Sequence, residues 1–333
     1  MKPAVLIPEK LTLALLIGLL LIACQGKADD ADTAVGSYPN GDLLVETDWL
    51  ADQVDNLDAV RIIDIREPAD YAEAHIPGAV SVPLNAITET IDDIPLEFDE
   101  QEVQDALEAA ALEPGMTAVI YDDLGMMNAA RLFWTLEYVG HADARVLHGG
   151  WNAWVAEERE TTAEAPDVGS SDYPIVIDDE KLATADYILN HLNDPNVTIV
   201  DARSSAEYTG DLTYSDRSGH IPGAVNLVWL DALTGGDAVQ TTEDDWQEQL
   251  RDEDIEIFKS ANEITTLLQD RDINPENEII TYCQTMWRAA HVYYLLRLMG
   301  YENVRGYDGS WAEWGNNPDL PIVTGDQPGQ FDN

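Results

Sequence analysis

Basic residues are scarce in this 333-residue chain. Only 17 lysines and arginines stand against 64 aspartates and glutamates, which gives a formal net charge of −47. A protein that binds nucleic acid needs a basic face for the phosphates, so this composition excludes a nucleic-acid partner. Apolar residues still make up 45% of the chain, which is enough for packed cores and excludes a wholly disordered protein. The length is typical of about two domains.

Cysteine is scarcer still, with Cys24 and Cys283 as the two examples. Two cysteines exclude a scaffold of several disulfides and a zinc site built from several thiolates. The six histidines are scattered, and no two of them stand at the close spacing of metal ligands. We therefore expect neither a metal nor another cofactor. As a separate expectation, the protein is a monomer.

The hydrophobic run near the N-terminus is short. It covers the thirteen residues Leu11–Ala23 behind Lys2 and Lys10, whereas a bilayer span takes ~20 residues. The run ends in Leu21-Ile22-Ala23-Cys24, which resembles the lipobox of bacterial lipoproteins. This resemblance implies a signal peptide over 1–23, a lipid on Cys24 and an extracytoplasmic, membrane-anchored protein. The alternative is a cysteine that merely ends an apolar helix. The small polar residues of 24–41 predict a flexible tether.

Cys283 is the one thiol that remains if Cys24 is lipidated. It then has no partner for a disulfide within the chain. A lone thiol outside the cytoplasm is exposed to oxidation, so its presence there indicates a chemical use.

The rest of the chain contains an internal sequence repeat of two copies. Ile63–Tyr71 matches Val200–Tyr208, and His75–Val80 recurs as His220–Val225, with eight more residues between the two segments in the second copy. Gly149–Trp154 recurs as Gly309–Trp314. An ordered repeat of this length predicts a duplicated domain and not a solenoid. The predicted organisation is a first domain over 42–160, a linker over 161–177, a second domain over 178–325 and a tail over 326–333.

Short apolar runs alternate with helical patterns in both copies. Strands are predicted at Ala59–Asp64, Thr117–Tyr121, Val197–Asp201, Glu278–Tyr282 and Asn303–Tyr307. Helices are predicted at Ala129–Val139, Lys181–Leu192 and Arg288–Met299. Such alternation favours the α/β class, with a parallel sheet covered by helices on both faces in each domain.

Cys283 stands between a predicted strand and a predicted helix. The first copy has Asp122 at the matching point, and its loop is one residue longer. Ligands of open α/β sheets bind at the carboxyl ends of the strands, where these loops lie. The free N–H groups of a helix start, the helix dipole and Arg288 all favour a thiolate, and hence a nucleophile, at Cys283. The alternative from the residues alone is a buried structural cysteine.

The sequence resembles the rhodanese family of sulfurtransferases over about 42–325, in the tandem form with an inactive first domain. The motifs that carry the resemblance are Asp201-x-Arg203 with Glu207-Tyr208, Gly219-His220-Ile221-Pro222-Gly223-Ala224, Cys283-x4-Arg288 and Tyr307-Asp308-Gly309-Ser310-Trp311. The resemblance implies a thiosulfate sulfurtransferase that takes a small anionic sulfur donor, thiosulfate or 3-mercaptopyruvate. Cys283 becomes a persulfide, and cyanide or a thiol then accepts the sulfur.

The resemblance also assigns roles to single residues. Gln284, Thr285, Met286, Trp287 and Arg288 inherit the persulfide-binding loop. Arg203 is expected to hold the anionic substrate, and Asp64 and His75 are expected to face a pocket between the domains. One departure is Met286, because active loops of this length commonly carry glycine there, which matters if the backbone needs a positive φ.

Several alternatives stay open. The chain could be a non-catalytic sulfur-relay or persulfide-binding lipoprotein, or a purely structural protein. Asp201 and Arg203 form an equally plausible structural pair, because Asp64 and Arg66 repeat it in the domain that lacks the thiol. The two His-Ile-Pro-Gly-Ala segments favour tight turns over chemistry. A cysteine phosphatase is disfavoured, since only four residues separate Cys283 from Arg288 and its loop needs five.

Overall fold

The computed structural model describes residues 37–88, 90–91, 94–95, 99–239, 246–251 and 257–331. The predicted signal peptide and Cys24 lie outside the described residues. Among the helices that are described, none is both long and apolar enough to cross a bilayer.

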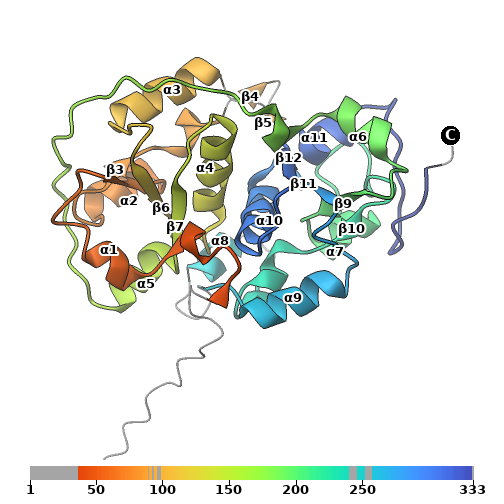
Figure 1. The fold of residues 1–333 in the computed structure, drawn as a ribbon. Helices are drawn as coiled ribbons and strands as arrows, with labels where there is room; N and C mark the ends of the chain where they lie inside the picture. The colour runs from red at the N-terminus through yellow and green to blue at the C-terminus, as the bar shows by residue number, and fades with distance from the viewer. Residues whose placement is uncertain are drawn as a thin grey trace, which may run out of the picture. The chain divides into compact units, whose positions relative to one another are not determined.

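The first half is built on a sheet of five parallel strands in the order β1-β7-β6-β2-β3 (Figure 1). The strands are β1 (Leu44–Val45), β2 (Val60–Asp64), β3 (Val80–Ser81), β6 (Thr117–Tyr121) and β7 (Ala144–Leu147). The helices are α1 (Thr47–Ala51), α2 (Pro68–Glu73), α3 (Glu100–Ala109), α4 (Met127–Tyr138) and α5 (Gly150–Ala156), with short 3-10 turns η2 (Gly41–Leu43) and η3 (Leu84–Ala86). A separate antiparallel pair joins β4 (Thr90–Ile91) to β5 (Ile94–Pro95).

The second half repeats this topology in the order β8-β12-β11-β9-β10. Its strands are β8 (Leu182–Ala183), β9 (Val197–Asp201), β10 (Val225–Asn226), β11 (Glu278–Tyr282) and β12 (Val304–Tyr307). Its helices are α6 (Ala185–His191), α7 (Ser205–Thr209), α8 (Trp246–Leu250), α9 (Ala261–Gln269), α10 (Trp287–Leu298) and α11 (Ser310–Trp314), with 3-10 turns η4 (Asp179–Lys181), η5 (Trp229–Ala232) and η6 (Gly236–Ala238).

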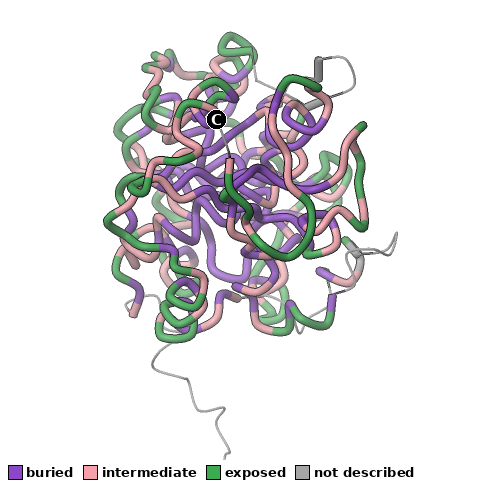
Figure 2. The backbone as a smooth tube through the Cα atoms, turned by 90° about the vertical axis from the view of Figure 1, so that its right-hand side faces the viewer, coloured by how far each residue is buried: buried purple, intermediate pink, exposed green. Residues whose placement is uncertain are grey.

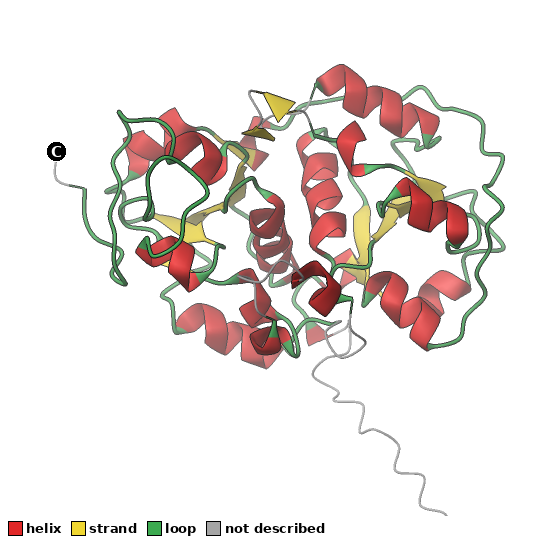
Figure 3. Cartoon of the chain, turned by 180° about the vertical axis from the view of Figure 1, so that it is seen from behind, coloured by secondary structure: helices red, strands yellow, loops and turns green. Residues whose placement is uncertain are grey.

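The central strands of the two sheets pair in the same register. Asp64 lies opposite Tyr121 in the first sheet, and Asp201 lies opposite Tyr282 in the second. The central strands are buried on both faces because helices cover both sides of each sheet (Figure 3). The predicted fold class, two α/β units with parallel sheets, is therefore confirmed.

One predicted helix is shorter than its pattern. The periodicity of 181–192 indicated a helix throughout, but α6 begins at Ala185. Leu182 and Ala183 instead pair with β12 as the edge strand β8. The Thr184 hydroxyl accepts a hydrogen bond from the backbone N–H of Tyr187, which caps the helix start. The cap and the free sheet edge together outweigh the helical periodicity of the first residues.

Helices α4 and α10 pack against each other between the two sheets (Figure 1). The Phe133 and Tyr294 rings meet edge to face with centroids 4.8 Å apart, and the Tyr293 hydroxyl donates to the Glu137 carboxylate at 2.6 Å. One cluster of buried apolar side chains continues from the first half into the second, and the buried backbone runs through the interior in Figure 2. The two halves therefore share a core.

The connection between the halves lies along the first half. Thr162 forms a backbone bridge with His75, and the buried Tyr173 hydroxyl lies 2.9 Å from Nδ1 of His141. The Ser171 hydroxyl donates to the carbonyl of Leu112 at 2.6 Å. These contacts fasten the segment to the first domain along much of its length.

Candidate active site

The loop that carries Cys283 is fixed from behind by one serine. Cys283 follows directly after β11, and α10 begins four residues later at Trp287. The Ser310 hydroxyl accepts hydrogen bonds from the backbone N–H groups of Cys283 at 3.3 Å and Met286 at 3.1 Å, and it donates to the carbonyl of Tyr307 at 2.8 Å. Ser310 belongs to a motif that the sequence singled out, but this role was not predicted.

The matching loop of the first half shows what such a loop binds. The Asp122 carboxylate accepts four backbone hydrogen bonds, two on Oδ1 from Leu124 and Met126 and two on Oδ2 from Asn128 and Ala129, at 2.6 to 3.1 Å. Burial raises the pKa of Asp122 to about 6, although these backbone donors, Ala129 foremost, pull it down. The loop therefore encloses a carboxylate with N–H groups, as helix N-termini do for anions.

Two of the corresponding donors in the second half are open, while that of Met286 binds Ser310. Counted from the left-handed residue that precedes each helix, Arg288 and Ala289 match Asn128 and Ala129. Within the described part of the chain, the backbone N–H groups of Thr285, Arg288 and Ala289 donate to no protein acceptor. Cys283 therefore stands where the first half has a carboxylate, beside unused donors that suit an anionic sulfur.

Met286 adopts the backbone conformation that makes glycine common at its position. Its φ is +68°, and Met126 at the same point of the first loop has +66°. For a side-chain-bearing residue this costs about 1 to 2 kcal/mol. The Met286 side chain is fully buried, and its methyl group lies beside Gly306, close to Trp134 of the first half. Met286 therefore packs between the domains and does not narrow the cavity.

Arg288 holds a buried carboxylate. Its Nη1 and Nη2 atoms donate to the two carboxylate oxygens of Glu207 at 2.6 and 2.9 Å, while the Glu207 side chain is only 3% exposed. Burial tends to raise the Glu207 pKa, but Arg288 and then Arg203 lower it to about 2. Glu207 is the third residue of α7 and completes a capping box with Ser204, which fixes its position.

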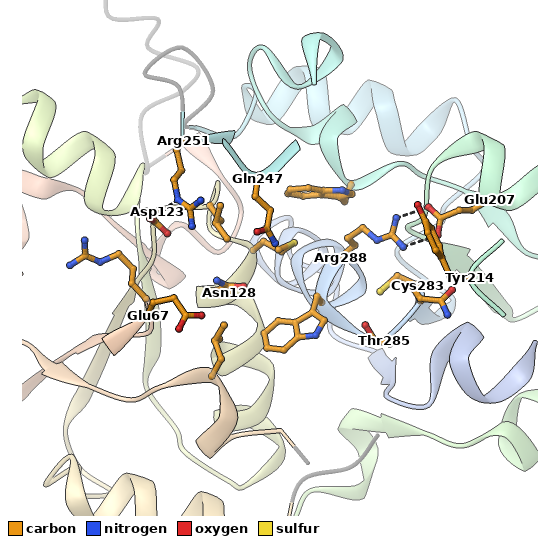
Figure 4. A pocket seen from close by; sticks show the side chains of 17 residues that line it. Glu67, Asp123, Asn128, Glu207, Tyr214, Gln247, Arg251, Cys283, Thr285 and Arg288 are labelled. Carbon is orange, nitrogen blue, oxygen red and sulfur yellow. Dashed lines mark hydrogen bonds and ion pairs between the residues drawn. The ribbon is translucent and has the colours of Figure 1, made fainter. Parts of the chain in front are cut away.

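Cys283 opens into a cavity of about 440 Å³ between the two halves (Figure 4). Of the predicted site residues, five line it: Cys283, Gln284, Thr285, Trp287 and Arg288. The residues that the sequence did not predict are Arg66, Glu67, Leu84, Asp123, Leu124, Met127, Asn128, Glu207, Tyr214, Trp229, Gln247 and Arg251. Most of these come from segments far apart in the sequence, which no local pattern connects.

Arg203 and Asp64 belong to structural clusters and do not line this cavity. The Arg203 guanidinium donates to Asp201 at 2.6 Å and to the carbonyl of Gly219 at 2.7 Å, and the Tyr282 hydroxyl also donates to Asp201. Asp64 makes the same contacts with Arg66 and Tyr121 in the first half. We expected both residues at the substrate, but their polar atoms are used internally. The structural reading of the Asp-x-Arg pair fits this placement.

His75 is also placed away from the cavity. Its ring is fully buried, stacks on Tyr71 with centroids 3.9 Å apart, and has Nδ1 2.7 Å from the Tyr71 carbonyl. His220 repeats the arrangement on Tyr208. Because both copies use the histidine alike, its role here is to fix the turn that follows.

The segment that holds the eight extra residues of the second half contributes Tyr214 to the lining of the cavity. Ser215 accepts a hydrogen bond from the Gln284 side chain at 3.1 Å, and Tyr214 lines the opening with 62% of its surface exposed. The Arg217 guanidinium anchors the segment by donating to the carbonyls of Trp314, Gly315 and Leu320. The insertion was visible in the sequence, although its position at the site was not. Within the described residues, no three metal-ligating side chains cluster.

The fold and the loop define a duplicated α/β protein in which the second half presents a single thiol among backbone donors and the first half fills the equivalent place with a carboxylate. The sequence profile of the rhodanese-like domain matches residues 46–157 and 184–317. The chain therefore belongs to the rhodanese family.

Known relatives agree with this family. A thiosulfate sulfurtransferase of Azotobacter vinelandii is 34% identical and is matched over 78% of this chain and 90% of its own length. A sulfur carrier protein of Thermus thermophilus is 32% identical and is matched over 87% of this chain and 99% of its own length. Among solved structures, the anaerobic ergothioneine biosynthesis enzyme of Chlorobium limicola is 25% identical and superposes with a TM-score of 0.72, covering 86% of this chain and 71% of that one.

Proposed function

We propose that this chain is a thiosulfate sulfurtransferase that carries the transferred sulfur as a persulfide on Cys283. The observation that supports this most is the pair of equivalent loops. The first binds a carboxylate with four backbone N–H groups, and the second leaves two of the matching donors, those of Arg288 and Ala289, open beside a thiol that lines a cavity. The similarity to named thiosulfate sulfurtransferases supports the same donor.

The reaction has two sulfur-transfer steps. In the first, the Cys283 thiolate attacks the outer sulfur of thiosulfate, the S–S bond breaks, and sulfite leaves with the electron pair. In the second, cyanide or a thiolate attacks the outer sulfur of the persulfide, and the electron pair returns to Sγ of Cys283. Each step is a nucleophilic displacement at sulfur, so no external oxidant or reductant is required.

The loop supports the anionic states of this cycle. The N–H groups of Thr285, Arg288 and Ala289 are available to the terminal sulfur, as those of Asn128 and Ala129 are to the Asp122 carboxylate. The Arg288 guanidinium adds a positive charge beside Cys283, although Glu207 already balances it. Because these groups are fixed before the reaction, they need little reorganisation as charge moves.

The test is mass spectrometry of the protein after exposure to thiosulfate. We expect a gain of one sulfur atom on the peptide that contains Cys283, together with steady release of sulfite when cyanide is added. Cys283→Ser should abolish both, whereas Asp122→Asn, at the matching point of the inactive loop, should retain both. A native protein whose Cys283 stays unmodified would overturn the proposal.

A sulfur carrier without turnover of its own is the second candidate. It is supported by the similarity to a protein named as a sulfur carrier and by the ion pair that already engages Arg288, the arginine of the Cys283 loop. A carrier would form the persulfide without steady sulfite release in the presence of cyanide. A parallel assay with 3-mercaptopyruvate, in which pyruvate is measured, decides between the two donors.

We further propose that the protein is an exported lipoprotein anchored through Cys24. The support is the sequence of residues 2–24 alone, with its lysines, short apolar run and lipobox-like end. Expression in a bacterial host should give a membrane-bound protein whose mature N-terminus is a diacylglyceryl-modified Cys24. Cys24→Ala should leave the protein uncleaved and unlipidated. A cleaved wild type without lipid would contradict this assignment.

A further inference from the structure

The charges that line the cavity do not favour an anion. Each of its arginines has a carboxylate partner: Arg288 has Glu207 at 2.6 Å, Arg251 has Asp123 at 2.9 Å, and Arg66 has Asp64 at 2.7 Å. Glu67 also lines the cavity, is exposed, and forms no ion pair within the described residues. The lining itself holds three arginines and three carboxylates, so its charges balance. Asp64, behind the lining, neutralises Arg66 and leaves Glu67 as a carboxylate in excess, before any charge on the sulfur of Cys283 is counted.

The remaining lining is apolar and aromatic. Trp229, Trp287 and Tyr214 contribute rings, and Leu84, Leu124 and Met127 contribute aliphatic surface. The cavity, at about 440 Å³, falls in the size range of sites that enclose organic ligands and exceeds what an inorganic ion needs. The backbone donors at Cys283 satisfy the reacting sulfur, which leaves most of this surface for another part of a larger molecule.

The two ends of the cavity differ in what they recognise. Cys283 and Arg288 lie on the second-half side, and Glu67 and Asp123 lie across from them on the first-half side (Figure 4). A molecule that places a sulfur at Cys283 therefore extends past aromatic side chains towards Glu67. The other charged side chains at that end, Asp123, Arg251 and Arg66, already have partners. Carboxylates and ring faces both attract a positive charge.

We propose that the acceptor is a small organic thiol that carries a positive charge, an aminothiol with an apolar or aromatic body. This inference rests on the proposed function, because it concerns the second step of that cycle. The thiolate of the acceptor attacks the outer sulfur of the protonated Cys283 persulfide. The S–S bond breaks, its electron pair forms the Cys283 thiolate, and the acceptor leaves as a persulfide that keeps the proton.

The test uses three aromatic thiols of nearly equal size: para-(aminomethyl)benzenethiol, para-(hydroxymethyl)benzenethiol and para-mercaptobenzoate. The protein is first loaded with sulfur from thiosulfate and separated from the donor, so that only the second step is measured. We expect kcat/KM to fall from the cationic to the neutral to the anionic thiol, with about a tenfold difference between the charged pair at low salt.

Variants of Glu67 locate the source of this preference. Glu67→Gln should reduce the cation-to-anion ratio about threefold, and Glu67→Lys should erase or reverse it. Glu73→Lys is the matched control, because this substitution makes the same change in net charge. Glu73 is an exposed residue of the nearby helix α2 and lies outside the cavity lining. The control should leave the ratio as in the wild type.

The outcomes separate this inference from the function on which it rests. If Cys283 forms no persulfide, the sulfurtransferase proposal fails. If the persulfide forms and cyanide removes the sulfur, but the three thiols react alike or Glu67→Lys leaves their ratio unchanged, the acceptor proposal alone is wrong.

Discussion

Glu207 and Arg288 form a largely buried ion pair at the edge of the Cys283 loop. A buried pair of this kind adds little net stability over an apolar pair, but the loss of one partner leaves the other charge uncompensated. The Glu207 pKa of about 2 lies below its ordinary value of 4.5, because Arg288 more than offsets the effect of burial. The folded protein therefore binds fewer protons at this residue than the unfolded chain does.

We predict that Glu207→Gln destabilises the protein in a pH-dependent way. The lowered pKa contributes about 3 kcal/mol to the free energy of unfolding at pH 7. That contribution is fully present above pH 4.5 and is lost as the pH falls towards 2. Urea unfolding should therefore show a wild-type advantage at pH 7 that shrinks by pH 3. Glu73→Gln should show no such trend, and an advantage independent of pH would contradict the assigned pair.

Asp122 has the opposite effect on how the free energy of unfolding depends on pH. Its pKa of about 6 lies above the ordinary 3.8, because burial outweighs the backbone donors. Its charge therefore opposes folding at neutral pH, and this cost disappears as the pH falls below about 4. Asp122 is common to wild type and variant, so comparing the two removes its effect from the Glu207 measurement.

Some of the site residues predicted from the sequence line the cavity in the structure. They are the ones close to Cys283 in the chain. Gln284, Thr285, Trp287 and Arg288 line the cavity because the turn from strand to helix is a local feature. Glu207 stands 81 positions from Arg288, and only the folded chain brings the two together. Arg203 is the opposite case, because its motif suggested a place at the substrate. Its partner Asp201 is close in the chain, but Tyr282, whose hydroxyl also binds Asp201, is distant in sequence, and the sequence motif did not reveal this cluster.

At the scale of elements, a buried ion pair joins the first half to the segment that fixes the Cys283 loop of the second. Nη1 of Arg131, on α4, lies 2.6 Å from Oδ1 of Asp308, with side chains 2% and 5% exposed. Asp308 stands two residues before Ser310, whose hydroxyl binds the N–H groups of Cys283 and Met286. A helix of the first half therefore supports the turn that fixes the loop of the second.

We predict that Arg131→Met lowers the free energy of unfolding by about 3 to 5 kcal/mol, because Asp308 is then buried without a counter-charge. Persulfide formation at Cys283 should slow in the same variant. Adding Asp308→Asn should recover much of the stability, and a double-mutant cycle by urea unfolding measures the coupling. Additive effects of the two changes would show that the pair is not coupled.

The elements themselves were largely predictable, for a physical reason. Strands β2, β6, β9 and β11 are mostly apolar because helices bury both of their faces, and such short runs are visible in the sequence. The edge strand β8 has two residues, which are too few to show the alternation of a strand. The helical pattern of the following residues therefore extends over it in the sequence. The packing of α4 against α10 was not predictable either, since most side chains of both helices are buried and no single apolar face marks the contact.

At the scale of the whole molecule, the net negative charge opposes the approach of the proposed anionic sulfur donor. The chain contains five lysines and a formal charge of −47, and the arginines that line the cavity are already paired. The repulsion of a dianion therefore acts mainly during its approach. The backbone donors of the loop act only once it has arrived.

We predict that kcat/KM for thiosulfate rises severalfold as neutral salt increases from about 0.01 to 0.1 M, because the Debye length shortens from about 30 to 10 Å. The value of kcat at saturating thiosulfate should change little, since the approach no longer limits the rate. Chloride and acetate salts should give the same dependence of kcat/KM on salt concentration. That result would exclude competition of one particular anion for the loop. The cationic thiol acceptor should show the opposite trend, because screening then removes an attraction. A flat or falling profile for thiosulfate would mean that the local donors at Cys283 outweigh the charge of the molecule even at low salt.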